Sequence, residues 1–371
     1  MIKHNANNER IKRQFFAYLK EAKRQSEDSV DAAATALARF EDYTGHRDFK
    51  SFHLEQAIAF KRDLARQRNQ VTGKALSKAT LNSTLAQLKR FFFWLADQPG
   101  YKGRLKYSDA DYFNLSEKDA RIATARRSRP VPTLEQIQHV LATMPAVTEL
   151  EKRDRAVIAF TLMTGARDSA TASIKLKHVD LETGCVFQDA REVNTKFSKS
   201  FMTYFFPVGG NALAILADWV FYLRTERLWC NDDPLFPATS TALGTTGQWE
   251  ATGIEARHWS SATPIRSIFK VAFTSAGLPY FNPHSVRNTL VRLGQVRCKT
   301  AEDFKSWSQN LGHEGVLTTL TSYGTVPLER QAEVIKHMAH APMVTGGIDH
   351  QRALEEVLRA LQGAGALPRT S

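Results

Sequence analysis

Apolar residues recur at three- and four-residue spacing along most of the chain, and this spacing indicates amphipathic helices. The period changes to two only from about residue 184, where short segments predict strands. These segments are 184–189, 191–195 and 201–208, with a turn at 197–200. We therefore expect a mainly α fold with a small antiparallel β-sheet, which places the chain in the α+β class.

Four helices are expected near the N-terminus, over residues 9–24, 29–44, 54–69 and 77–98. The fourth helix begins with Ser77 as an N-cap and ends before Pro99. Its polar start would face phosphates, whereas the apolar run from Phe91 to Trp94 would face a core. Residues 1–98 are accordingly predicted to form a helical domain.

A chain of 371 residues exceeds the usual size of one hydrophobic core, so a second domain is expected. Residues 99–130 are predicted to be a linker, which ends in the basic run Ala125–Pro130. A second domain would span 131–345, with Thr133 as a helix N-cap and Gly165 ending an apolar helix. Residues 346–371 would be a tail.

Within the second domain, the segment 238–264 is rich in small polar residues, which predicts a flexible insertion. Further helices are expected at 211–229, 265–276, 284–296, 301–311 and 315–322.

Positive charge is concentrated in the first third of the chain. Residues 1–130 hold 26 lysines and arginines against 15 acidic residues, a net charge of +11, although the whole chain carries only +12. A polyanion such as DNA is a natural partner for this region, and a solvated basic surface is the alternative. The sequence contains no apolar run of about 18 residues and no secretory signal, and its three cysteines are far apart. We therefore expect a cytoplasmic, nucleoid-associated protein without structural zinc or a disulfide framework.

Several residues that could act on a phosphate follow one another along the second domain. Each has an ordinary alternative: the arginine and the lysines could be solvated, and the tyrosine could be half-buried in a core. His284 and Arg287 lie three residues apart near a predicted helix start, which places them on one helix face. The full series is Arg167 after a Thr-Gly turn, Lys196 and Lys199 near a hairpin tip, His284, Arg287, His313 in Leu-Gly-His, and Tyr323.

In this order, the residues resemble those of the tyrosine recombinase (phage integrase) family, and the resemblance runs from about residue 9 to residue 328. It implies a SAM-like core-binding domain in residues 1–98 and a catalytic domain in 131–345, which together form a C-shaped clamp around duplex DNA. It also implies a homotetramer on DNA, with no cofactor or metal. The residues expected to contact DNA outside the catalytic set are Lys74, Lys78, Thr80, Arg126, Arg127, Arg129 and Lys199.

The resemblance also implies a role for each residue of the series. Arg167 and Arg287 would bind the non-bridging oxygens of the scissile phosphate, because planar guanidinium groups suit its charge. Tyr323 would attack the phosphorus to form a 3′-phosphotyrosyl link. Lys196, or Lys199 in its place, would protonate the leaving 5′-oxygen. His284 would assist proton transfer at the tyrosine, and His313 would bind the phosphate.

The sequence departs from the family at three places. The family usually has an acidic residue three positions after the first arginine, where this chain has Ala170, and Asp168 is the nearest acid. The intervals from Arg287 to His313 and from His313 to Tyr323 are slightly longer than usual. We expect a site-specific recombinase of a mobile element, as an integrase or transposase, working alone or with other recombinases and directionality factors. The alternatives are a catalytically inactive DNA-binding accessory protein and a DNA-relaxing topoisomerase.

Overall fold

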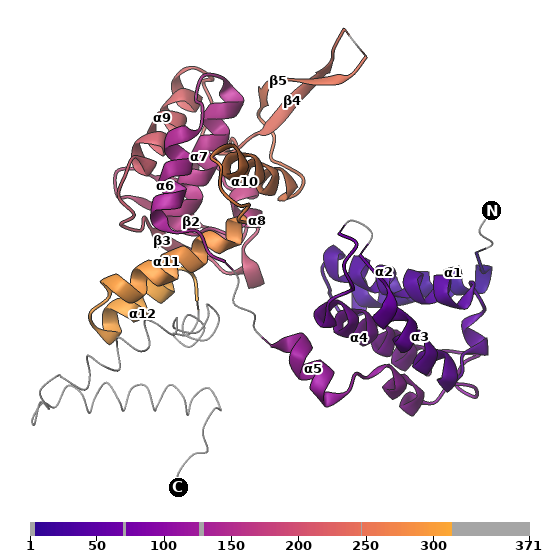
Figure 1. Ribbon diagram of the computed structural model, residues 1–371. Coiled ribbons are helices and arrows are strands. Elements are labelled where there is room, and N and C mark those ends of the chain that lie inside the picture. Colours follow the sequence, from indigo (N-terminus) through magenta and orange to yellow (C-terminus); the bar gives the residue numbers. More distant parts are fainter. Residues whose placement is uncertain (1–3, 70–71, 126–129, 246, 314–371) are drawn as a thin grey trace, which may run out of the picture. The chain divides into compact units, whose positions relative to one another are not determined.

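The computed structural model describes residues 4–69, 72–125, 130–245 and 247–313 (Figure 1). The chain divides into two compact units, residues 1–127 and 128–371, and each unit has a hydrophobic core of its own. Within the described ranges, no helix is both long and apolar enough to cross a membrane.

The first unit is helical, as its sequence predicts. Its elements are α1 (Ala6–Ala17), the π-helical turn η1 (Tyr18–Ala22), α2 (Glu27–Thr44), η2 (Phe49–Ser51), α3 (Leu54–Arg66), α4 (Lys78–Leu95), η3 (Tyr107–Phe113) and α5 (Glu117–Thr124). The predicted N-cap of α4 is confirmed, because the hydroxyl of Ser77 accepts a hydrogen bond of 3.1 Å from the backbone N–H of Thr80.

Aromatic side chains of α4 form the centre of the first core. The ring of Phe92 lies 5.4 Å from that of Phe40 and 5.2 Å from that of Phe113, measured between centroids. The prediction that all residues from Phe91 to Trp94 face the core is wrong for Phe93, which is 53% exposed. Successive side chains on a helix are rotated by about 100°, so four neighbours cannot share one face.

The predicted linker is partly wrong, because much of 99–125 belongs to the first unit. In this stretch η3 packs on α4, and Phe113 is fully buried in the first core. Helix α5 also packs on α4, where Asp119 forms an ion pair of 2.9 Å with Lys78. A 3₁₀ helix has about three residues per turn, so the apolar residues of η3 do not follow the α-helical spacing on which the sequence analysis relied.

The second unit combines helices with two small antiparallel sheets, which confirms the predicted fold class. Its helices are α6 (Leu134–Thr143), α7 (Glu149–Thr164), α8 (Asp168–Ser173), η4 (Leu176–His178), η5 (Lys196–Ser198), α9 (Ala212–Thr225), α10 (Thr263–Ser275), α11 (Pro283–Arg297) and α12 (Ala301–Asn310). Its strands are β1 (Val179–Asp180), β2 (Cys185–Gln188), β3 (Phe201–Tyr204), β4 (Ala238–Leu243) and β5 (Trp249–Glu255). Helix α7 is the centre of this core: its last turns are buried all round, and it ends at Gly165 as predicted. The predicted helix at 315–322 lies outside the described residues.

Strands β1, β2 and β3 form one sheet in that order, with Cys185 opposite Tyr204 and Gln188 opposite Phe201. The predicted strand at 191–195 is wrong, because these residues form turns. The carboxylate of Asp189 accepts hydrogen bonds from the backbone N–H and the guanidinium of Arg191, and the N–H of Val193 donates to the Asp189 carbonyl. Such local bonds compete with a strand ladder.

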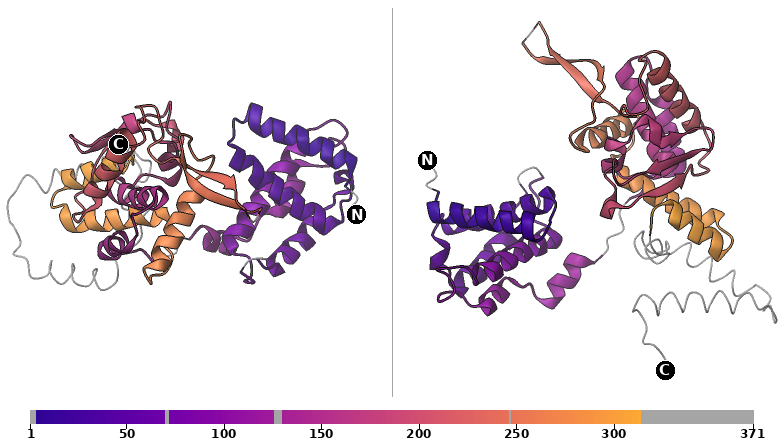
Figure 2. Two further views of the ribbon diagram at one scale, coloured as in Figure 1. Left: turned by 90° about the horizontal axis from the view of Figure 1, so that it is seen from above. Right: turned by 180° about the vertical axis from the view of Figure 1, so that it is seen from behind.

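The flexible insertion predicted at 238–264 is instead a β-hairpin, β4–β5, followed by the start of α10. Figure 1 and the right view of Figure 2 show that strands β4 and β5 project away from the helices of the second unit. The base is held by the core: Ile254 is buried, and the guanidinium of Arg153 donates a hydrogen bond of 2.9 Å to the hydroxyl of Thr239.

Candidate active site

The buried guanidinium of Arg287 joins three segments of the second unit. Arg287 lies on α11, just after the helix start at Pro283, and is only 2% exposed. One terminal nitrogen donates to the backbone carbonyl of Gly165, and the other donates to the carbonyl of Leu311 at 2.6 Å. The latter nitrogen also lies 3.0 Å from Nε2 of His313. These contacts fix the guanidinium plane and satisfy much of its buried hydrogen-bonding capacity.

Two glycines permit this close approach. Gly165 ends α7 with a φ of +59°, and a Cβ at this position would lie 2.9 Å from side-chain carbons of both Leu290 and Leu311. Gly312 has a φ of +69°, and its Cβ would lie 2.6 Å from the ring of Phe201. Both positions require a left-handed backbone and a missing side chain. Steric constraints therefore explain why the Thr-Gly and Leu-Gly-His motifs of the sequence contain glycine.

The two histidines of the series are held neutral. Burial lowers the pKa of His313 to about 4, and the charges of Arg287 and Arg167, together with His284 and Lys196, act in the same direction. Desolvation is also the largest cause that lowers the pKa of His284, and the charges of Arg287 and Arg167 lower it further. Because Arg287 can only donate, Nε2 of His313 is the accepting nitrogen, and the neutral ring carries its proton on Nδ1.

Arg167 is the N-cap of α8 and follows the left-handed Gly165 by two residues. Its positive charge acts on both imidazoles, so it lies at the same site as Arg287. Ala170, at the position where an acid was expected, is buried. The nearby Asp168 forms an ion pair of 2.7 Å with Arg266 of α10 and raises the pKa of His284, against the effect of the arginines.

Lys196 begins the short turn η5 between β2 and β3, and its charge also acts on His284 and His313. Its ammonium lies 4.6 Å from the ring centroid of Phe197. Phe197 is 75% exposed and has a φ of +61°, and Ser198 follows with +51°. Two consecutive left-handed residues without glycine form a strained turn. The sequence analysis did not single out Phe197, and no periodicity could have indicated it.

Five residues of the predicted series, Arg167, Lys196, His284, Arg287 and His313, thus come together around one site. Tyr323 lies outside the described residues, ten positions after His313. Lys199 lies beside this site: together with Tyr204, Asn310 and His313 it lines a hollow of about 620 Å³.

The other expected DNA contacts belong to the first unit or to the segment after it. Lys74 is exposed in the loop before α4, and Lys78 on the first turn of α4 pairs with Asp119. The hydroxyl of Thr80 lies 2.9 Å from that of Ser77. Arg126, Arg127 and Arg129 lie outside the described residues.

Comparison with known proteins gives consistent results for both units. Residues 13–99 match the phage integrase N-terminal SAM-like domain. The tyrosine recombinase XerC of Lactobacillus delbrueckii subsp. bulgaricus is 24% identical over 253 residues, which cover 67% of this chain and 72% of the relative. XerC of Xanthomonas axonopodis pv. citri is also 24% identical, over 73% of this chain and 72% of its own length.

Solved structures with a similar fold include a lambda integrase dimer bound to a COC′ core site and the Tn1549 transposon integrase in complex with transposon right end DNA. The first has a TM-score of 0.57 at 11% identity and covers 86% of this chain and 99% of its own. The second has a TM-score of 0.56 at 14% identity and covers 89% and 99%. These likenesses establish the fold, and the sequence matches agree with it. In sequence and in fold, the chain is therefore similar to the tyrosine recombinases and phage integrases, and its residues 13–99 match the N-terminal SAM-like domain of phage integrases.

Proposed function

We propose that the chain cuts and rejoins double-stranded DNA at a specific site of a mobile element, through a 3′-phosphotyrosyl intermediate on Tyr323. The observation that carries this proposal is the gathering of Arg167, Arg287, Lys196 and two neutral imidazoles around one site. Two guanidinium groups and a lysine ammonium in one place suit a phosphate diester whose negative charge grows in the transition state.

Each residue has a role that fits its environment. Arg287, fixed by the carbonyls of Gly165 and Leu311, and Arg167 would bind the non-bridging oxygens. The phenol oxygen of Tyr323 would attack the phosphorus while the bond to the 5′-oxygen breaks. Lys196 would supply the proton that makes this oxygen a hydroxyl. A neutral His284 can accept a proton from the attacking phenol, and the pKa of His284 is lowered in the required direction.

The two units would hold the duplex as a clamp, and four copies would work on two duplexes in the cytoplasm, at the nucleoid. In this arrangement the basic surface of the first unit supplies most of the electrostatic attraction to DNA. Lys74, Lys78 and Thr80 at the start of α4, Lys199 beside the site, and Arg126, Arg127 and Arg129 would contact the backbone.

A selection for covalent capture tests the proposal and identifies the target sequence at the same time. The full chain is incubated with nicked duplexes of randomised sequence, and DNA that remains attached to protein in denaturant is sequenced. We expect one recovered sequence, no adduct with Tyr323→Phe, and unchanged adduct formation with the control Tyr280→Phe. An adduct that survives Tyr323→Phe would refute the assignment. Specific binding without any adduct would instead favour the DNA-binding accessory protein, and capture without sequence preference would favour a topoisomerase.

A further inference from the structure

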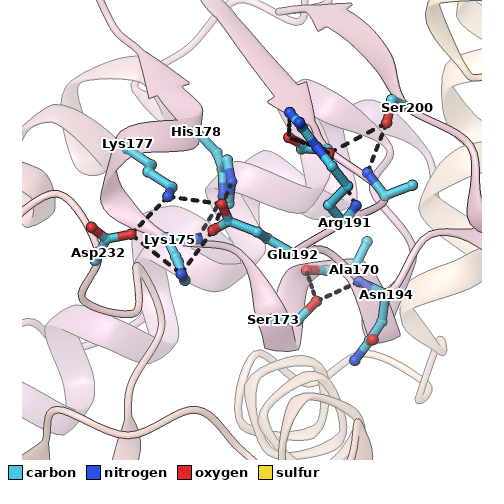
Figure 3. A network of polar contacts seen from close by, with 12 residues as sticks. Ala170, Ser173, Lys175, Lys177, His178, Arg191, Glu192, Asn194, Ser200 and Asp232 are labelled. Atoms are coloured by element: carbon cyan, nitrogen blue, oxygen red, sulfur yellow. Dashed lines mark hydrogen bonds and ion pairs between the residues drawn. The ribbon is translucent and has the colours of Figure 1, made fainter.

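The segment that carries Lys196 is bonded to the helix that begins beside Arg167. The backbone N–H of Asn194 donates to the hydroxyl of Ser173 at 2.8 Å, and the hydroxyl of Ser169 donates to the Asn194 carbonyl at 3.2 Å. Ser169 and Ser173 lie four residues apart on α8, so they share one helix face. Figure 3 shows the Ser173 hydroxyl between the carbonyl of Ala170 and the backbone of Asn194.

This clasp, formed by Ser169, Ser173 and the backbone of Asn194, is the short route between the two cationic groups. Arg167 precedes Ser169 by two residues, and Lys196 follows Asn194 by two residues. An extended chain advances about 3.3–3.6 Å per residue, so each end of the clasp lies within about 7 Å of a cationic residue along the backbone. A shift of Asn194 relative to α8 would therefore displace Lys196 from Arg167 directly.

A second set of contacts holds the same segment from the other side. The carboxylate of Glu192 forms ion pairs of 2.7 Å with Lys175 and 2.9 Å with Lys177, and Asp232 pairs with both lysines (Figure 3). These groups are partly exposed, so each pair contributes little alone, and the shared geometry orients the segment. The side chain of Val193, between Glu192 and Asn194, is buried in the core.

The fixed part of the β2–β3 connection therefore ends at Asn194, and the strained turn begins two residues later. Lys196 is exposed, and the following Phe197 and Ser198 are both left-handed. The turn itself thus has few packing contacts that could hold the lysine. Its position therefore depends on the two ends of the turn: the clasp at Asn194, and the hydroxyl of Ser200, which accepts a hydrogen bond of 2.9 Å from the N–H of Ala190.

We propose that Ser169 and Ser173 are positioning residues that hold Lys196 at the distance from Arg167 that proton transfer to the leaving oxygen requires. This inference rests on the proposed function. In the reaction, the phenol proton of the tyrosine passes to His284 as the tyrosine oxygen bonds to phosphorus. The bond from phosphorus to the 5′-oxygen breaks, and a proton of the Lys196 ammonium passes to that oxygen. The clasp touches neither substrate nor reacting atoms.

The leaving group distinguishes a positioning role from a structural one. A substrate with sulfur in place of the scissile 5′-oxygen releases a thiolate, which is stable without a proton because thiols have a pKa near about 8.5. The probe is the nicked duplex recovered in the selection above, prepared with oxygen or sulfur at this position. The rate of adduct formation is measured in a single turnover with excess full-length protein.

We expect Lys196→Ala to slow adduct formation about 100-fold or more with the oxygen substrate, as the loss of a general acid does. With the sulfur substrate, the rate of this variant should return towards that of the parent protein. Ser173→Ala and Ser169→Ala should each slow adduct formation about tenfold or more with the oxygen substrate, but less than about threefold with the sulfur substrate. These losses are smaller than that of Lys196→Ala, because the lysine is displaced and not removed. Ser173→Thr keeps the hydroxyl and should retain the rate. The control Thr225→Ala removes a hydroxyl that bonds a helix carbonyl at 2.9 Å on α9 and should not change either rate.

Equal losses on both substrates in the serine variants would overturn the positioning role while leaving the proposed function intact. A Lys196→Ala variant that sulfur does not rescue would overturn this inference together with the role of Lys196. Neither result affects the separate test of Tyr323, so failure of the clasp and failure of the reaction are distinguishable. If one serine variant does not fold, as judged by urea denaturation, the other removes a different bond of the same clasp.

Discussion

At the scale of single residues, the environment of His313 makes stability depend on pH. Burial and the neighbouring Arg287 lower its pKa to about 4, whereas in the unfolded chain it titrates near about 6.5. Between these values the unfolded state binds more protons than the folded state, so the free energy of unfolding falls as the pH decreases. The stabilisation is fully present above about 6.5 and decreases progressively towards 4.

His313→Gln removes this contribution, so urea denaturation between pH 7 and pH 4 should show a shallower decline than in the parent protein. The decline should not vanish, because the pKa values of His178, His258 and His284 are lowered in the same direction. Identical slopes in parent and variant would contradict the neutral, buried state of His313.

The sequence predicted the residues of the candidate site, but it could not establish that any of them converge. Arg287 and the carbonyl of Gly165 are 122 positions apart, and only folding of α7 and α11 on each other makes their bond. The residues were singled out because their types and their order along the chain match those of a family. Such a match indicates which chemical groups are present, but not where they lie in space. Ser169, Ser173 and Asn194 were missed, because their contacts involve backbone atoms and short hydroxyls that carry no sequence signature.

At the scale of elements, the hairpin β4–β5 illustrates where sequence periodicity fails. Strand prediction depends on alternation between a buried and an exposed face, but both faces of the distal hairpin are exposed, including Leu243 and Trp249 at the tip. Helices such as α4 and α6, by contrast, combine a capping side chain with one apolar face, and both signals are local. Local signals therefore predicted most helices, and elements defined by distant contacts were missed.

The burial of residues along the hairpin predicts which of them stabilise the second unit. Replacing residues 242–250 by Asn-Gly would keep the pair Thr241–Ala251 and form a two-residue turn. The free energy of unfolding should change by less than about 1 kcal/mol, because the distal residues are exposed. Ile254→Ala is the matched comparison at the buried base and should cost about 2–5 kcal/mol. Both changes are measured by urea denaturation. Equal destabilisation by the two would show that the distal residues also stabilise the second unit, contrary to this prediction.

At the scale of the whole molecule, the charge is divided unevenly between the two units. Residues 1–130 carry a net charge of +11 out of +12, and α4 with the loop before it presents Lys74 and Lys78 near one end. A protein that neutralises several phosphates releases the counterions of DNA, so its affinity falls steeply with salt concentration. The second unit, almost neutral overall, would contribute through its site more than through its net charge.

We therefore expect the affinity of the full chain for the selected duplex to fall at least about 100-fold between 50 and 200 mM salt. Lys74→Gln should weaken binding and reduce the slope of log affinity against log salt by about 1, because one phosphate contact is lost. Lys102→Gln is a matched control: Lys102 pairs with Asp97 beyond the other end of α4, an 18-residue helix about 27 Å long. Fluorescence anisotropy across the salt series measures both slopes. An affinity that hardly changes with salt would mean that the basic first unit does not hold the duplex, and equal slopes for the two variants would exclude the loop before α4 as its contact.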